Sequence, residues 1–530
     1  MMRNITQLEH APMKMMTSLT IATLLLATFL AQHCPAAEQT QDRPNFLFIL
    51  SDDQAPDAMG ALGNEDIKTP HLDTLARRGT TFTHCFNQGS WSGAVCVASR
   101  TMLITGQTVY RAPRNTPYLD DWAHAKGPLA VHQETAVKLW PEVFRDAGYQ
   151  TFLTGKWHNS LASVGQGFTS AKSVGEGFYD THEGSRVKYF DNPGYQRPAA
   201  DRDRWTPWDP SFHGHWTPAV RDLQSNGELG DAYDVQQHTS ELYADAAVDF
   251  LTQSKRQASP FFMFVAFNAP HDPRQSPRSF VEQYPPEQIS LPANYLPEHP
   301  FNNGAITIRD EQLAPFPRTE EAVRVHRSEY YAMITHMDRE IGRILKALDE
   351  SGEAGNTYVV FTSDHGLAMG SHGLMGKQNP YDHSIRMPFV ICGPGIPKNR
   401  RVNDMIYMQS VYPTTCELAG LSVPESVEFS SVKTLATGES KSGGEPIIYG
   451  TYLAFQRLVR TQTHKLIYYP KLDRYQLFDL VNDPGEITDL SADPSHASVL
   501  KRLKKRLTQQ RTDLGDGMLK SSPSTAQESR

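Results

Sequence analysis

The sequence predicts an α/β protein: a large, mainly parallel sheet sandwiched by helices, followed by a small C-terminal antiparallel sheet plus a helix. Four continuous apolar runs alternate with stretches in which apolar residues recur at helical spacing. After residue 445 the pattern changes to short, β-rich runs separated by turn residues. At 530 residues the chain is also too long for one ordinary core, so we expect two domains.

The four apolar runs are the expected central strands of the large sheet. A strand buried on both faces carries apolar residues without alternation, as parallel strands covered by helices do. Amphipathic stripes between the runs indicate the covering helices. The strands are expected at residues 45–50, 150–154, 260–267 and 356–362, and the helices around Leu72, Leu75 and Ala76, at 243–251 and at 334–348.

Reactive side chains follow the end of each expected strand. Ligands of parallel sheets bind beyond the carboxyl ends of the strands, so we expect these side chains to meet in one crevice. Carboxylates gathered at one point need a cation, and oxygen-rich sites suit Ca²⁺ or Mg²⁺. An Asp-Asp pair after a strand is otherwise as often a cap or a turn. The side chains are Asp52, Asp53, Lys156, His158, His271, Asp364 and His365.

The C-terminal part predicts a second, smaller layer. Its β-rich runs suggest an antiparallel sheet, and a basic amphipathic helix with Leu500, Leu503 and Leu507 on one face follows them. We expect a solvated helix that packs on the small sheet, with a polyanion-binding face as the alternative. The runs cover residues 446–450, 456–461, 464–469 and 475–480.

The N-terminal segment has the pattern of a secretory signal peptide. Lys14 precedes an apolar run at 19–31, which is too short to span a bilayer, and Ala36 and Ala37 follow it. A membrane anchor is the alternative. We expect a secreted or periplasmic protein with no stable membrane insertion after the signal is removed. The expected parts are a signal peptide at 1–37, a catalytic α/β domain at 44–422, a C-terminal subdomain at 423–515 and a disordered tail at 516–530.

Composition narrows the function classes. Hydrophobic residues make up 39% and charged residues 21%, which is typical of a globular protein rather than a disordered one. The net charge of -8 argues against nucleic acid as the partner. The cysteine spacings match neither a metal knuckle nor a disulfide framework, and no disulfide pairing is predicted.

Cys96 lies in the most distinctive stretch of the chain, residues 92–106. Arg100 follows four residues later, and an apolar turn leads to Thr105 and Gly106, which predicts a loop leading into a short helix. A lone cysteine among apolar residues is more often inert core than chemistry. Evidence for a reactive Cys96 therefore has to come from motifs elsewhere in the chain.

Several segments resemble the signatures of type I, formylglycine-dependent sulfatases of the alkaline phosphatase-like superfamily. The run from Cys96 to Arg100 resembles the Cys-x-Pro-Ser-Arg motif of that family, with Ala98 where the family usually has Pro. Further segments are similar to family motifs in the same order along residues 44–490. They are 48–54, 69–79, 155–158, 361–366, 372–378 and 477–486.

The resemblance implies a sulfuric ester hydrolase whose cysteine is converted to formylglycine by a maturation enzyme, the hydrated aldehyde being the nucleophile. It also implies a divalent cation, Ca²⁺ rather than Mg²⁺. Arg100 would hold the nucleophile, His158 would act as its base, and His271 would protonate the leaving alcohol. The implied cation ligands are Asp52, Asp53, Asp364, His365 and the modified Cys96, and the residues around the sulfate are Lys156, His271 and Lys377.

The chemistry of sulfate esters agrees with these residue types. The negative charge of the ester repels nucleophiles, so cations must neutralise it. Lys156 and Lys377 follow different strand ends, and we expect them to act as one anion clamp. Lysine is rarely buried unpaired, and we expect the substrate sulfate to be the counter-charge of both side chains.

The substrate class is suggested by residues 201–216, which hold three tryptophans in a Pro-rich insertion. Aromatic faces and arginines suit sugar rings with anionic groups, although aromatic residues that fasten a long loop fit equally well. Export together with this loop favours a sulfated carbohydrate. Two other hypotheses are a phosphonate or phosphate-ester hydrolase of the same fold, and a catalytically silent binder of sulfated glycans, which Ala98 permits if modification fails.

Overall fold

The computed structural model describes residues 43–113, 137–175, 206–212, 214–253 and 259–517. The predicted signal peptide, Trp205 and residues 518–530 of the predicted tail lie outside this part of the chain. Residues from Pro44 onward belong to one compact unit. Within the described ranges, no helix is long and apolar enough to cross a membrane.

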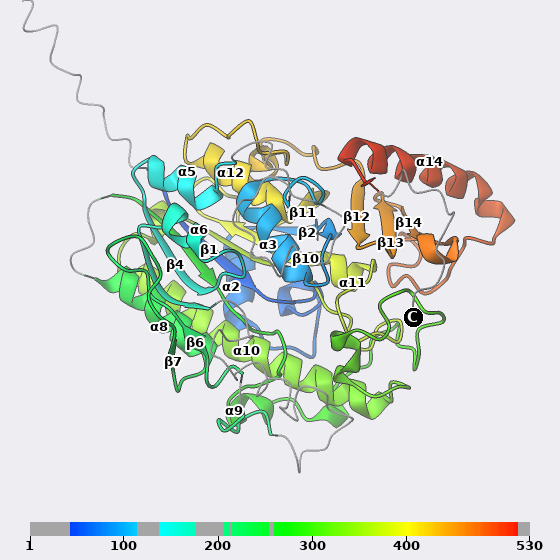
Figure 1. Ribbon diagram of the computed structural model, residues 1–530, viewed down its shortest axis with the longest axis horizontal. Coiled ribbons are helices and arrows are strands. Elements are labelled where there is room, and N and C mark those ends of the chain that lie inside the picture. The colour runs from blue at the N-terminus through cyan, green and yellow to red at the C-terminus, as the bar shows by residue number, and fades with distance from the viewer. Residues whose placement is uncertain (1–42, 114–136, 176–205, 213, 254–258, 518–530) are drawn as a thin grey trace, which may run out of the picture. The chain divides into compact units, whose positions relative to one another are not determined.

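An eight-stranded sheet forms the centre of the molecule (Figure 1). Its order is β11-β2-β10-β9-β1-β8-β4-β5. β10 is antiparallel to both of its neighbours, and every other pairing is parallel, so the predicted mainly parallel sheet is confirmed. The strands are β1 (Asn45–Ser51), β2 (Thr80–Phe86), β4 (Gln150–Lys156), β5 (Ser170–Gly175), β8 (Phe261–Ala266), β9 (Thr357–Ser363), β10 (Arg386–Cys392) and β11 (Arg400–Tyr407).

The four strands predicted from the apolar runs are β1, β4, β8 and β9, and they are neighbours in the order β9-β1-β8-β4. The register shows that their carboxyl ends lie side by side. Ser51 pairs with Ser363, and Ala266 pairs with both Leu50 and Gly155. The polar residues that follow these strands therefore start from one edge of the sheet.

Side chains of β1 explain why the run lacks alternation. Leu47 and Ile49 belong to the core on one face of the sheet, whereas Phe46 and Phe48 belong to the core on the other face. The Phe48 ring centroid lies 4.9 Å from that of Trp140. Successive residues of β1 point to opposite faces of the sheet. Both sets are apolar because helices cover both faces.

The covering helices fall into two layers, as predicted. α2, α8 and α10 contribute to one core, and α3, α5, α6, α12 and α13 to the other. The long α10 begins after Thr319, whose side chain accepts a hydrogen bond from the N–H of Ala322. The helices are α2 (Pro70–Arg78), α3 (Val95–Thr105), α5 (Trp140–Asp146), α6 (Ala162–Gly167), α8 (Thr239–Thr252), α9 (Arg278–Val281), α10 (Glu320–Glu350), α11 (Asp382–Ile385), α12 (Val411–Leu418), α13 (Lys433–Thr437) and α14 (Ala497–Leu514).

A five-stranded sheet of order β15-β14-β13-β12-β3 follows in the C-terminal part. Its four C-terminal strands are antiparallel, as predicted. The fifth, β3, comes from the segment just before Cys96 and pairs in parallel with β12, which the sequence did not indicate. The strands are β3 (Gly89–Ser90), β12 (Ile448–Tyr452), β13 (Gln456–Arg460), β14 (His464–Tyr469) and β15 (Arg474–Asp479), and a separate pair is formed by β6 (Ala219–Val220) and β7 (Tyr233–Asp234).

α14 packs on the small sheet through Leu503 and Leu507, which are buried. One boundary of the predicted tail needs correction. Asp516 is buried, and its carboxylate accepts hydrogen bonds from Arg457 Nε at 2.8 Å and Arg511 Nε at 2.7 Å. Ordered packing therefore continues beyond Gly515, because this ion pair fastens the chain after α14 to β13.

Candidate active site

Two acidic strand ends meet at the edge of the large sheet. Asp52 and Asp53 follow β1, and Asp364 follows β9, its direct neighbour. The backbone N–H of Asp53 donates to Asp364 Oδ1 at 3.1 Å, and the N–H of Asp364 donates to the Ser51 carbonyl at 3.1 Å. Asp53 has a φ of 70°, a conformation that turns the chain sharply after the strand. All three carboxylates are buried.

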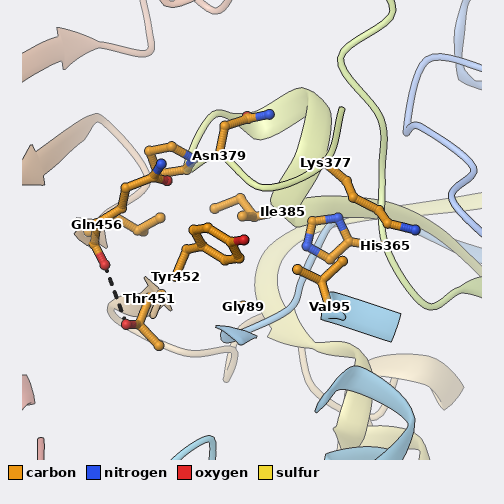
Figure 2. A pocket seen from close by; sticks show the side chains of 12 residues that line it. Gly89, Val95, His365, Lys377, Asn379, Ile385, Thr451, Tyr452 and Gln456 are labelled. Carbon is orange, nitrogen blue, oxygen red and sulfur yellow. Dashed lines mark hydrogen bonds between the residues drawn. The ribbon is translucent and has the colours of Figure 1, made fainter. Parts of the chain in front are cut away.

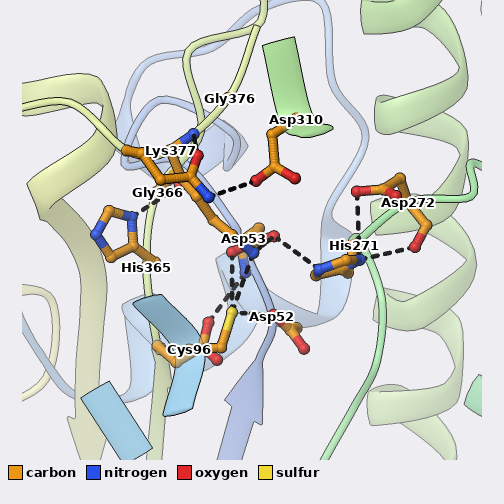
Figure 3. A network of polar contacts seen from close by, with 12 residues as sticks. Asp52, Asp53, Cys96, His271, Asp272, Asp310, His365, Gly366, Gly376 and Lys377 are labelled. Atoms are coloured by element: carbon orange, nitrogen blue, oxygen red, sulfur yellow. Dashed lines mark hydrogen bonds and ion pairs between the residues drawn. The ribbon is translucent and has the colours of Figure 1, made fainter. Parts of the chain in front are cut away.

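Cys96 is the second residue of α3 and is 2% exposed. Its Sγ donates to Asp52 Oδ1 at 3.2 Å and to Asp53 Oδ1 at 3.6 Å, and it accepts a hydrogen bond from Lys377 Nζ at 3.0 Å. Figure 3 shows the sulfur pointing toward the two carboxylates, with Lys377 on one side and His271 on the other. The side chain at position 96 therefore lies among donors and acceptors rather than in an apolar core.

Three buried cations accompany the three acids. Lys156 forms an ion pair with Asp52, Lys377 forms one with Asp53, and Arg100 Nε donates to Asp364 Oδ2 at 2.8 Å. The sequence led us to expect the substrate sulfate as the counter-charge of both lysines. That expectation is wrong for this state of the protein, because Asp52 and Asp53 already supply the counter-charge that a buried ammonium group needs.

The ionisation of the acids is not uniform. Burial raises the pKa of Asp53 well above its ordinary value despite Lys377, and the neighbouring Asp52 and Asp364 raise it further. Burial and the Asp52 charge also raise the pKa of Asp364. Burial alone would raise the pKa of Asp52 as well, but Lys156, His271 and Arg100 hold it well below its ordinary value. Burial thus favours the protonated form of two of the three carboxyl groups, although each of them has a cationic partner.

The cysteine thiol itself is a poor nucleophile here. Burial raises the pKa of Cys96 well above its ordinary value, and the charges of Asp364, Asp52 and Asp53 raise it further. A thiolate would have to form beside three carboxylates. Because the thiolate is the reactive form, this environment works against ordinary cysteine nucleophilic catalysis.

His271 lies closer to the acids than the sequence could show. Its Nε2 is 3.7 Å from Asp53 Oδ2, and its Nδ1 lies 2.7 Å from the Asp272 carbonyl oxygen. Burial lowers the pKa of His271 well below its ordinary value, and Lys377 and Lys156 lower it further. With Nδ1 donating to the carbonyl, the neutral ring presents an unprotonated Nε2 to the acids.

A cation could be held by four of these side chains. Ligand atoms of Asp52, Asp53, Cys96 and His271 all lie within 4.8 Å of one another. Carboxylate oxygens are the donors that Ca²⁺ and Mg²⁺ prefer, and a bound cation would offset the burial that raises the pKa values of Asp53 and Asp364. The donor set therefore fits a divalent cation.

The remaining predicted residues lie around this group. His365 directs Nδ1 to the Gly366 carbonyl oxygen at 3.1 Å and, with Lys377, lines a small pocket (Figure 2). It is not one of the four clustered ligand residues, whose histidine is His271. His158 follows β4 with a φ of 52° and is half-buried. Burial lowers the pKa of His158 well below its ordinary value, and Lys156 and Arg100 lower it further.

Two acidic residues that the sequence did not reveal position the segment carrying Lys377. Glu311 accepts the N–H groups of Met375 and Gly376, each at 2.8 Å, and Asp310 accepts from Gln378 Nε2 at 2.8 Å. A Cβ atom at Gly376 would come within 2.8 Å of the Asp310 Cβ, so only glycine fits there. Neither acid follows a predicted strand, and both are distant in sequence from Lys377, so no local pattern could have identified them.

The small sheet also contributes to the site. Tyr452 of β12 and Gln456 of β13 line the pocket that contains His365 and Lys377 (Figure 2). The tryptophan-rich loop, in contrast, is partly structural. Trp216 Nε1 donates to the Pro207 carbonyl at 3.0 Å, and Trp208 packs against the large core. Trp205 lies outside the described residues.

Comparison with known proteins agrees with this architecture. A model of the Sulfatase family matches residues 44–421, and a second, described as N-sulphoglucosamine sulphohydrolase, C-terminal, matches residues 370–513. An arylsulfatase of Clostridium perfringens is 27% identical over 481 residues, covering 88% of this chain and 94% of the relative. An N-acetylglucosamine-6-O-sulfatase of Bacteroides thetaiotaomicron is 25% identical over 523 residues, covering 89% and 87%.

Solved structures share the fold. A complex with the substrate D-glucosamine-2-N,6-O-disulfate superimposes with a TM-score of 0.68 at 22% identity, covering 89% of this chain and 98% of the other. A phosphonate monoester hydrolase of Agrobacterium radiobacter gives a TM-score of 0.64 at 22% identity, covering 89% and 96%. The fold, the extent of the family match and the curated relatives lead to one conclusion: the chain belongs to the sulfatase family of the alkaline phosphatase-like superfamily and is a sulfuric ester hydrolase.

Proposed function

We propose that this sulfatase removes sulfate from a sulfated carbohydrate, with Cys96 in its formylglycine form as the nucleophile and a bound Ca²⁺ as cofactor. The observation that carries the proposal is the position of Cys96 Sγ between two carboxylates and Lys377 Nζ. A relative named N-acetylglucosamine-6-O-sulfatase and a solved complex with D-glucosamine-2-N,6-O-disulfate support a carbohydrate substrate, and the arylsulfatase relative leaves an aryl sulfate as the alternative.

The surroundings of position 96 support the formylglycine form. Formylglycine supplies hydroxyl groups, one of which attacks sulfur, in place of a thiol whose pKa is raised. Hydroxyl groups at this position would find acceptors in Asp52 and Asp53 and a donor in Lys377, the partners that Sγ has now. Arg100 is proposed to hold this region through its hydrogen bond to Asp364.

Residues proposed to hold the cation are Asp52, Asp53, Asp364, His365 and residue 96. His271 is the alternative nitrogen ligand, since its ring lies within the clustered group and that of His365 does not. A bound divalent cation would neutralise the carboxylates and polarise the sulfate ester. Lys156 and Lys377 bind the sulfate oxygens in this proposal, because their ammonium groups already lie within reach of residue 96 and its neighbours.

Proton transfers are assigned to the two histidines that follow β4 and β8. His158 is proposed as the base for the nucleophile, which suits a ring kept neutral by burial and by Lys156. His271 is proposed to donate a proton to the leaving alcohol. Its pKa is lowered in part by Lys377 and Lys156, so the negative charge of a substrate sulfate between those lysines would raise it toward the range where the ring carries that proton.

Export and maturation belong to the same proposal. The sequence pattern of residues 1–37 supports secretion or a periplasmic location. A formylglycine-generating enzyme is the partner needed for Cys96. The boundary between a catalytic part at 44–422 and a C-terminal subdomain at 423–515 also remains a prediction.

The test uses one preparation assayed on sulfate esters and on phosphate or phosphonate esters, with Cys96→Ala as the background. We expect the sulfated sugar to be hydrolysed at least about tenfold more efficiently than the phosphorus esters. Mass spectrometry of the Cys96 peptide should show an aldehyde in place of the thiol. Preference for phosphonate esters, or an intact thiol in a fully active preparation, would contradict the proposal.

A further inference from the structure

Four cations of α14 are gathered within one stretch of the helix. Lys501, Arg502, Lys505 and Arg506 are all exposed. None of them forms an ion pair or a hydrogen bond with another residue that the structure describes. The other cations of this helix are accounted for, since Lys504 Nζ lies 3.7 Å from the centroid of the Tyr475 ring and Arg511 pairs with Asp516.

Helix geometry places the four charges on one face. Lys501 and Lys505 are four residues apart, as are Arg502 and Arg506, so the two pairs lie side by side on the helix surface. Leu503 and Leu507 face the small sheet instead. Like charges at this spacing destabilise a helix, so folding does not explain why they are gathered here. We call these four residues the α14 basic face.

The long helix α10 shows how this chain treats exposed cations elsewhere. Three exposed cations of α10 each pair with a carboxylate on α8 or α10 itself. The whole chain also carries a net charge of -8, so the positive charge of the α14 basic face contrasts with the negative charge of the protein as a whole. The pairs are Arg339–Glu241 at 3.0 Å, Arg343–Asp245 at 2.5 Å and Lys346–Glu350 at 3.7 Å.

We propose that the α14 basic face binds the chain of a sulfated polysaccharide, as a second contact outside the catalytic site. This inference depends on the proposed function, since it extends a sulfated carbohydrate to a polymeric one. Sulfate groups repeated along a polymer match a cluster of fixed cations, and the arginine guanidinium pairs with such oxyanions through two parallel hydrogen bonds.

The position of the helix supports this occupant. α14 packs on β13 and β14, as Figure 1 shows, and β13 also carries Gln456, which lines the pocket beside Lys377. Val459 of β13 contacts the α14 layer, whereas Leu458 lines the pocket. The basic face lies on the side of α14 away from the small sheet, so both the helix and the sheet separate it from the pocket beside Lys377. A polymer long enough to pass around the edge of the sheet could engage both and gain affinity from two linked contacts. A lipid surface fits less well, because the apolar residues Leu503 and Leu507 are buried rather than beside the cations.

The experiment reverses the four charges together, Lys501→Glu, Arg502→Glu, Lys505→Glu and Arg506→Glu. A matched control reverses four exposed cations elsewhere: Arg77, Lys398, Arg401 and Lys441. Binding is measured to dextran sulfate, and kcat/KM is measured on a sulfated polysaccharide and on its monosaccharide sulfate. We expect the α14 variant to bind dextran sulfate about 10–100-fold more weakly than the control at about 50 mM salt, with a shallower salt dependence.

Turnover separates this inference from the proposed function. For the α14 variant, kcat/KM should fall on the polymer and stay within about twofold on the monosaccharide sulfate, because the face lies outside the catalytic site. Equal dextran sulfate binding by the two variants would overturn the inference. Tighter binding to duplex DNA or to anionic vesicles, lost in the α14 variant, would also overturn it. Failure of the wild-type protein on every sulfated sugar would instead count against the proposed function, while the dextran sulfate comparison still decides the α14 basic face.

Discussion

The molecule buries two clusters of opposite charges, and they differ in the other groups that the charges surround. The catalytic cluster lies at the carboxyl edge of the large sheet, and the C-terminal cluster lies where the small sheet meets the segment after Lys377. The catalytic cluster comprises Asp52, Asp53, Asp364, Arg100, Lys156 and Lys377, and the C-terminal cluster comprises Asp382, Glu486, Arg460 and Lys465.

In the C-terminal cluster two cations lie against two carboxylates, and burial still raises the pKa of Glu486 despite Lys465. Lys465 Nζ donates to Asp382 at 2.6 Å, to Glu486 at 2.5 Å and to the Pro380 carbonyl at 3.1 Å. The N–H of Asp382 donates to Glu486 at 2.7 Å. Burial would raise the pKa of Asp382, but Arg460 and Lys465 hold it far below its ordinary value. This cluster fastens the small sheet to the catalytic segment.

In the catalytic cluster burial likewise raises the pKa values of Asp53 and Asp364, whereas that of Asp52 is held low. The same residue types therefore serve two purposes. The C-terminal cluster joins parts of the fold, whereas the catalytic cluster also has ligand atoms of Cys96 and His271 close to those of Asp52 and Asp53, a grouping that can hold a cation. Substitutions in the two clusters should separate activity from stability, and the following predictions test that separation.

The largest effect is expected for Cys96→Ala. We expect kcat/KM to fall by at least about 10³-fold, because the proposed nucleophile is lost while the cavity created is small. The unfolding midpoint should change little. The matched control is Cys416→Ala, a buried cysteine of the apolar core, which should keep full activity and lose about 1 kcal/mol of stability. Activity of Cys96→Ala within tenfold of wild type would refute the nucleophile assignment.

Lys377→Ala should lower kcat/KM by roughly 10²–10³-fold, as the loss of an electrostatic donor to a reacting group typically does. Because Lys377 pairs with Asp53, its removal should also destabilise the cation-free protein by about 3–5 kcal/mol. Calcium should restore much of that stability by supplying the missing positive charge. The check is the unfolding midpoint with chelator and with Ca²⁺. An unchanged midpoint in chelator would contradict the ion pair, and unchanged kcat/KM would contradict the sulfate clamp.

Lys465→Met should act on stability far more than on chemistry. It leaves Asp382 and Glu486 buried without their ammonium partner, so the free energy of unfolding should fall by about 3–5 kcal/mol. The folded fraction should keep kcat/KM within about tenfold of wild type. Combining it with Asp382→Asn should recover part of the loss, measured as coupling in urea unfolding. Simple additivity of the two losses would mean that the C-terminal cluster is not a unit.

The smallest effect concerns pH. Burial lowers the pKa of His372 to about 4, from an ordinary value near 6.5. The unfolded chain therefore binds a proton between pH 6.5 and 4 that the folded protein excludes. The resulting stability is complete above pH 6.5 and is lost as the pH falls toward 4, by less than about 3 kcal/mol. His372→Asn suits the φ of 55° and should flatten the stability profile between pH 6.5 and 4.5. An unchanged slope would show that other groups dominate acid unfolding.

Sequence patterns predicted the centre of the fold well. β1, β4, β8 and β9 were all indicated by apolar runs, since strands buried on both faces leave no room for polar alternation. β2, β5, β10 and β11 were not indicated. β2 contains Thr80, Thr81, Thr83 and His84 among its apolar residues, so no continuous run marks it. Periodicity also gave no sign that β10 is antiparallel, because strand direction depends on connections rather than on composition.

The candidate site was predictable in its members but not in its contacts. Strand ends brought Asp52, Asp53 and Asp364 together because parallel strands end at one edge. The proximity of His271 to Asp53 depends on how the loop after β8 turns, and no residue pattern reports that turn. The pairing of Lys377 with Asp53 was also not predictable. These two residues are distant in sequence, and only the folded sheet brings them together.

The parallel pairing of β3 with β12 limits how early the segment before Cys96 can reach its folded position during synthesis. Gly89 and Ser90, just before the Cys96 helix, cannot join the small sheet until Thr451 and Tyr452 have been synthesised. At about 5–20 residues per second, the ribosome needs roughly 20–70 s to make the residues in between. Lys377, which contacts Cys96 Sγ, also emerges late in that interval. The segment around Cys96 therefore spends tens of seconds of synthesis without the partners that finally enclose it.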